Sequence, residues 1–167
     1  MIQIRQSVFE TNSSSTHSLT FGGDFAYHRW IESNGDTKFD EKIDIDSSMG
    51  FGWDQETFNG SNSLASYLWI WLVDKKIGEE DVDTLRNHPM VISFFNGINR
   101  RTLYPITFYE VVDTDRETYK IDGYIDHQSN ELVDKELELW NGSFDDFVEY
   151  FVWSCEVQLE TDNDNHN

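Results

Sequence analysis

The side chains best suited to chemistry lie together in residues 10–18, which read Glu-Thr-Asn-Ser-Ser-Ser-Thr-His-Ser between two hydrophobic stretches. Histidine is the side chain whose ordinary pKa lies nearest to neutrality, so His17 can take a proton from a neighbouring hydroxyl. The run therefore predicts a small hydrolase or transferase in which His17 is the general base. The candidates for the other roles are Ser13, Ser14 and Ser15 as nucleophile or ligand-binding hydroxyl, and Glu10 and Asn12 as the orienting group.

Two other interpretations of the same run remain open. Ser, Thr and Asn side chains bond their own backbone, which makes them typical of turns and caps, so the run can be a structural loop. It can also bind an oxyanion, because its hydroxyls and amide donate hydrogen bonds and a preceding arginine supplies positive charge. The residues of that binding site would be Arg5, Asn12, Thr16 and His17.

Residues 5–18, Arg-Gln-Ser-Val-Phe-Glu-Thr-Asn-Ser-Ser-Ser-Thr-His-Ser, resemble the opening of a scattered group of small bacteriophage and prophage proteins. The resemblance ends by residue 20. It implies a phage origin and suggests that residues 5–18 are important, either for folding or for chemistry. It carries no catalytic assignment, so it does not decide between chemistry and folding.

The chain is strongly acidic, with 32 Asp and Glu against 12 Lys and Arg and a formal net charge of −20. Residues 61–101 carry five acids and five bases, whereas residues 102–167 carry seventeen acids and three bases. A phosphate backbone is repelled by such a surface, which excludes conventional nucleic-acid binding. The charge instead predicts an interaction protein that binds a basic, nucleic-acid-binding host protein.

Acidic pairs at i, i+2 predict where that interaction surface lies. On a β-strand such carboxylates are about 6.6 Å apart, close to the spacing of phosphates along a nucleic-acid strand. The protein can therefore be a DNA mimic that inhibits host machinery or defence. A further alternative is a virion or assembly component whose charge only keeps it soluble. The acids expected on the surface are Asp113, Asp115, Glu117, Glu136 and Glu138.

The sequence predicts no metal site and no cofactor. The five histidines have no ligand spacing, and Cys155 is the single cysteine, so a zinc site is not expected. No glycine-rich phosphate loop occurs. The longest apolar stretch, residues 68–73, is far below the roughly 20 residues that a membrane helix needs. We expect a cytoplasmic protein, in the host cell if phage-encoded, that does not bind a membrane; the partner's identity and the oligomeric state stay open.

Two helices are clear from local signals. Residues 63–77 are apolar on nearly every side, with Ser63 as the expected N-cap and Gly78 beyond the end, which predicts a central buried helix. A last helix should begin after an N-cap at Ser143, because two aspartates and an apolar stripe follow.

Alternating and β-branched stretches predict the strands. A strand at residues 2–9 is followed by the polar run and by a returning strand at residues 19–21. The other expected strands are 38–46, 106–112 and 119–125, the last two forming an antiparallel hairpin. The fold class is α+β, an antiparallel sheet packed against the central helix and the C-terminal helix, in a single domain of residues 1–160 with a polar, frayed tail at 161–167.

Overall fold

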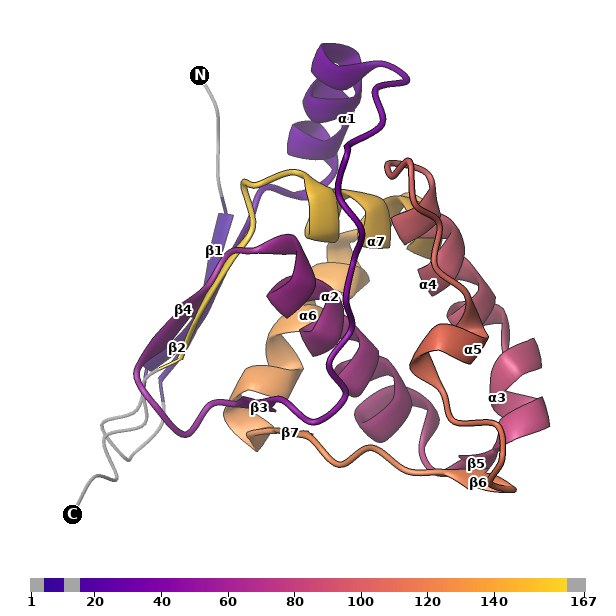
Figure 1. Ribbon diagram of the computed structural model, residues 1–167. Coiled ribbons are helices and arrows are strands. Elements are labelled where there is room, and N and C mark those ends of the chain that lie inside the picture. The colour runs from indigo at the N-terminus through magenta and orange to yellow at the C-terminus, as the bar shows by residue number, and fades with distance from the viewer. Residues whose placement is uncertain (1–4, 11–15, 162–167) are drawn as a thin grey trace.

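One antiparallel sheet joins two strands from the N-terminal region, one from residues 56–58 and one from near the C-terminus, and it lies at the left of Figure 1. The computed structural model describes residues 5–10 and 16–161. The sheet confirms the expected strand pair near the N-terminus, although the second strand begins at Thr16, so His17 belongs to a strand and not to a loop. In spatial order the four strands are β1 (Arg5–Glu10), β2 (Thr16–Phe21), β8 (Gln158–Thr161) and β4 (Glu56–Phe58).

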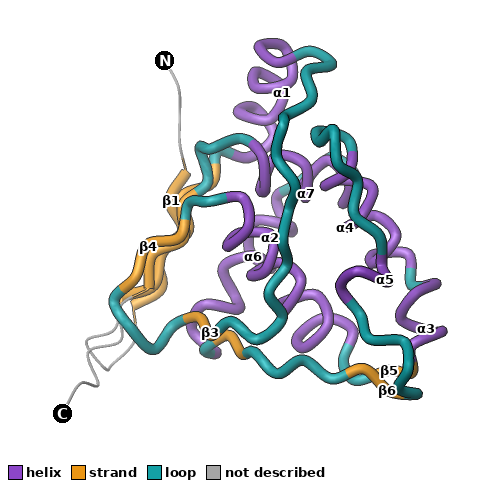
Figure 2. Tube along the Cα trace, in the orientation of Figure 1, coloured by secondary structure: helices purple, strands orange, loops and turns teal. Residues whose placement is uncertain are grey.

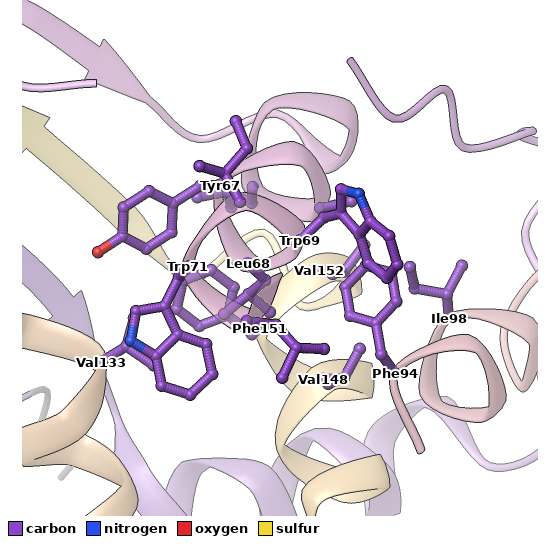
Figure 3. Close-up of a cluster of buried hydrophobic side chains, with 14 of the residues drawn as sticks. Tyr67, Leu68, Trp69, Trp71, Phe94, Ile98, Val133, Val148, Phe151 and Val152 are labelled. Carbon is purple, nitrogen blue, oxygen red and sulfur yellow. The ribbon is translucent and has the colours of Figure 1, made fainter. Parts of the chain in front are cut away.

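The predicted central helix is confirmed as α2 (Ser61–Ile70), which continues as the π-helical segment η1 (Trp71–Ile77). Every residue from position 64 to 73 is buried. Figure 3 shows Trp69 and Trp71 on different sides of this helix. The helix begins after Gly60, so the expected cap at Ser63 is wrong.

The C-terminal helix α7 (Phe144–Trp153) connects the sheet with the other helices. The hydroxyl of Ser143 accepts a hydrogen bond from the backbone N–H of Asp146 at 3.2 Å, which confirms the expected N-cap. One side of α7 packs its phenylalanines on Phe21 of β2, with ring centroids 5.0 Å apart for Phe147. Its other side packs against α4 (Pro89–Asn99).

The predicted hairpin of residues 106–112 and 119–125 is wrong. The first stretch contains helix α5 (Phe108–Val111), which a capping box of Thr107 and Glu110 begins. In the second stretch, two short strands pair with distant segments and not with each other. Strand β6 (Thr118–Tyr119) pairs antiparallel with β5 (Glu80–Asp81), and β7 (Tyr124–Ile125) pairs parallel with β3 (Gly50–Phe51).

Residues 38–46 also form no strand beyond one bridge between Phe39 and Thr102. This segment is held by hydrogen bonds to side chains and not by the backbone hydrogen bonds of a strand ladder. The backbone N–H of Asp44 donates to Asn62 Oδ1 at 3.0 Å, and that of Asp46 donates to Ser66 Oγ at 2.9 Å, both on α2. Apolar and polar residues alternate in residues 38–46 because the segment packs its apolar side chains against the core.

Together the elements form one α+β domain, as predicted, with helices on one side of the sheet (Figures 1 and 2). Helix α6 (His127–Leu139) covers β1 and β2. No helix within the described ranges is long and apolar enough to cross a membrane. The remaining helices are α1 (Gly23–Asn34) and α3 (Val82–Asn87).

Candidate functional site

The strand register decides which residues of the N-terminal run come together. Phe9 lies opposite His17 and Glu10 opposite Thr16, so these positions are neighbours at one end of the ladder. Arg5 pairs with a residue at the far end. It is four residues from Phe9, about 13 Å along the strand, so the ladder does not bring it to His17. Asn12, Ser13, Ser14 and Ser15 lie outside the described residues.

His17 is fully buried between the sheet and α6. Its Nδ1 atom lies 2.7 Å from the hydroxyl oxygen of Ser129, which is also fully buried. The hydroxyl of Tyr67 donates to the Ser129 carbonyl at 2.6 Å. Burial raises the pKa of Tyr67, and the nearby charge of Asp134 raises it further, so this hydroxyl keeps its proton. The three side chains tie β2, α6 and α2 together.

A hydroxyl beside an imidazole is also how a nucleophile meets its base. Here neither side chain has any exposed surface, so a substrate in solvent does not contact them. The arrangement therefore stabilises the contact between sheet and helix. Sequence reasoning missed Ser129 because it is 112 residues from His17, and no local pattern marks it.

Several of the described acidic residues lie at or beside the β5–β6 ladder, which is at the lower right of Figure 1. There the turn of residues 113–117 lies beside the start of α3. The two segments line one groove of about 540 Å³, together with Arg86 and Tyr109. We call this region the acidic corner and define it by the carboxylates Glu80, Asp81, Asp83, Asp113, Asp115 and Glu117.

The acidic corner is anchored to the core. The backbone N–H of Val82 donates to the Glu117 carbonyl at 2.9 Å. Tyr119 of β6 is buried, and its hydroxyl accepts from Trp69 Nε1 at 3.2 Å. Asp81 caps α3 by accepting from the hydroxyl and the backbone N–H of Thr84, which lowers the pKa of Asp81. The backbone that carries these carboxylates is therefore held in position by hydrogen bonds.

Two arginines neutralise part of the acidic corner. Arg86 contacts Asp83 at 2.8 Å, and it also donates to the Tyr109 hydroxyl at 2.9 Å. Arg116 lies 3.9 Å from Asp113. Within the described ranges, the carboxylates of Glu80, Asp115 and Glu117 have no Lys or Arg nitrogen within 4.0 Å. The corner keeps a net negative charge available to a partner.

The other predicted acids do not join this surface. Glu136 and Glu138 lie on α6, where residues two apart point to different sides. Glu136 is only 2% exposed, so its assignment to the interaction surface is wrong, whereas Glu138 is exposed. Residues 113–117 form a turn and not a strand, so the regular spacing expected for a strand does not apply there either.

Three acids of the C-terminal segment are instead paired with arginines where α7 packs against α4. Arg100 contacts Asp145 at 3.3 Å, Asp146 at 2.7 Å and Glu149 at 3.2 Å. Arg101 contacts the other oxygen of Glu149 at 2.5 Å. These bases come from residues 61–101, so the charge bias along the sequence overstates the charge bias in space.

Among residues 5–10 and 16–161, no three His, Cys, Asp or Glu side chains come together as metal ligands. Neither a family model, nor a curated protein, nor a solved structure matches this chain. The resemblance of residues 5–18 to phage proteins therefore stays a prediction.

Proposed function

We propose that this protein is a binding protein whose acidic corner docks on the basic surface of a nucleic-acid-binding host protein. One observation carries the proposal: carboxylates from two segments far apart in the sequence converge on one groove. Asp81 and Asp83 come from the start of α3, and Asp115 and Glu117 come from the turn before β6. Complementary charge speeds encounter and selects partners.

Binding of such a partner does not require that the protein imitate the regular phosphate spacing of DNA. A partner that binds nucleic acid carries a basic groove, and a rigid acidic surface can occupy that groove by charge alone. Because residues 113–117 form a turn, the support comes from clustering and not from a phosphate-like row. Occupation of the groove would exclude nucleic acid and thereby inhibit the partner.

The enzyme alternative has one observation in its favour, the 2.7 Å contact between His17 Nδ1 and Ser129 Oγ. Complete burial of both side chains weighs against it. The virion or assembly alternative has no specific observation in its favour. The binding function is therefore our conclusion.

A capture experiment with matched variants tests the proposal. The corner variant is Asp113→Asn with Asp115→Asn and Glu117→Gln. The control variant is Glu32→Gln with Asp36→Asn and Glu138→Gln, three exposed acids outside the corner, so both variants lose the same net charge. Immobilised wild type and control should capture basic nucleic-acid-binding proteins from host lysate at low salt, and the corner variant should not. Equal capture by both variants, or capture indifferent to salt, would contradict the proposal.

A further inference from the structure

Trp53 and Tyr124 form an exposed pair of aromatic rings. Their side chains are 55% and 41% exposed, and the ring centroids lie 6.1 Å apart at an interplanar angle of 66°. Large exposed aromatic side chains are enriched where proteins bind partners. The pair is therefore a candidate contact point.

Local backbone geometry fixes both rings. The parallel pairing of β3 with β7 sets Gly50 opposite Tyr124. A Cβ atom on Gly50 would lie 2.5 Å from Cε1 of that tyrosine, so the glycine makes room for the ring. Gly52 has a φ of 113°, a conformation that favours glycine, and it turns the chain just before Trp53. The hydroxyl of Thr161 donates to the Asp54 carbonyl at 2.8 Å, which ties this turn to β8.

Three acidic residues lie near Trp53 and Tyr124 in the sequence. Asp54 follows the tryptophan directly, Glu56 begins β4, and Asp126 is two residues after Tyr124. A Cβ atom on Gly52, the residue before Trp53, would lie 2.4 Å from the Cβ atom of Asp126. Burial raises the pKa of Tyr124, and the negative charges of Asp54, Asp126 and Glu56 raise it further. In the described part of the chain, neither Asp54 nor Glu56 has a Lys or Arg nitrogen within 4.0 Å.

This combination fits a cation better than an apolar group. Aromatic faces attract cations, and a desolvated apolar ligand would gain nothing from the flanking carboxylates. Arginine fits better than lysine, because its planar guanidinium stacks on aromatic rings and bonds carboxylates in a bidentate way.

We propose that Trp53 and Tyr124 bind an arginine side chain of the basic partner, with Asp54 and Glu56 as its counter-charges. This inference rests on the proposed function, since it supplies a specific anchor for the same partner. Figure 1 shows the segment between β6 and β7 running along the lower edge of the molecule, with the acidic corner at one end and β7 at the other. An extended arginine-rich segment along this edge can contact both.

The test uses an arginine decapeptide and a lysine decapeptide as probes, titrated by calorimetry into the full chain. Trp53→Ala should weaken binding of the arginine peptide about 3- to 30-fold, with a smaller loss for the lysine peptide and little change in salt dependence. Phe25→Ala, which truncates a 65% exposed aromatic on α1, is the matched control and should bind as the wild type. Asp54→Asn with Glu56→Gln is a second variant that keeps the rings, and it should weaken binding and reduce the salt dependence.

The outcomes separate this inference from the proposed function. If Trp53→Ala and the Asp54/Glu56 variant bind both peptides as the wild type does, while the corner variant binds weakly, the result contradicts the arginine site and supports binding by the acidic corner. If only the Trp53 and Asp54/Glu56 variants lose affinity, the result supports the arginine site and contradicts binding by the acidic corner. If no variant loses affinity, both fail.

Discussion

Two acidic regions of this protein use the same residue types in opposite ways. At the interface of α4 and α7, Asp145, Asp146 and Glu149 each contact a guanidinium. At the acidic corner the carboxylates are on the surface, and several meet no base in the described part of the chain. The difference teaches that a net charge of −20 says little by itself, because only unpaired surface carboxylates are available to a partner.

The paired region, which consists of Arg100, Arg101 and the three acids of α7 that contact them, stabilises the fold. Arg101 is buried, and it donates to the carbonyl of Gly35 at 2.6 Å besides contacting Glu149. Its guanidinium also lies 4.8 Å from the ring centroid of Trp30 on α1. The network therefore joins α1, α4 and α7. We expect changes here to alter stability, whereas changes at the acidic corner should alter binding.

The largest effect on stability should come from Glu149→Ala. Glu149 and Arg101 are 4% and 6% exposed, and removal of Glu149 leaves the buried guanidinium of Arg101 without its carboxylate partner. We expect the free energy of unfolding in urea to fall by about 3 to 5 kcal/mol. Glu138→Ala, at an exposed position of α6, should change it by less than about 0.5 kcal/mol. Similar small losses for both variants would show that burial does not separate the two classes of acid.

A smaller loss should follow Ser129→Ala, which removes the hydroxyl beside His17. A buried polar atom that loses its partner costs about 1 to 3 kcal/mol, so we expect a loss of unfolding free energy in that range. Peptide binding by this variant should match that of the wild type. A stable variant with altered binding would instead assign the pair a functional role.

Acid should weaken the paired region through Asp146. Burial tends to raise the pKa of Asp146, but hydrogen bonds and charge from Arg100 outweigh it, so the pKa lies below its ordinary value of 3.8. A lowered pKa means that the charged form stabilises the fold above 3.8 and that this contribution disappears as the pH falls through the folded-state pKa. The unfolding free energies of wild type and Asp146→Asn should therefore differ at neutral pH and converge at low pH. A gap that persists in acid would contradict this assignment.

The corner variant, with Asp113, Asp115 and Glu117 neutralised, should show the smallest change in stability. The three side chains are exposed, so the unfolding free energy should change by less than about 0.5 kcal/mol. Urea unfolding measures this change. A larger loss would show that these acids support the fold, as those between α4 and α7 do.

Local signals made part of this fold predictable. The apolar run of α2 and the Ser143 cap are readable because the residues that decide them are neighbours in the sequence. The capping box of Thr107 and Glu110 was equally local, and the β-like composition of residues 106–112 concealed it.

The candidate sites depended on contacts that no local pattern contains. The acidic corner exists because two-residue strands, Glu80–Asp81 and Thr118–Tyr119, pair across a long separation in sequence. The burial of Glu136 followed from a helix that the sequence did not indicate, and that helix also supplies Ser129. Three acids of the predicted surface therefore lie at the corner, while Glu136 does not contribute to it.

The most direct measurement is the affinity for the arginine decapeptide as a function of salt, compared between the corner variant and the charge-matched Glu32/Asp36/Glu138 variant. We expect the corner variant to bind at least about threefold more weakly, with a shallower salt dependence, and the matched variant to bind nearly as the wild type does. Equal loss in the two variants would show that binding follows total charge and not the acidic corner, and it would contradict the binding function proposed above.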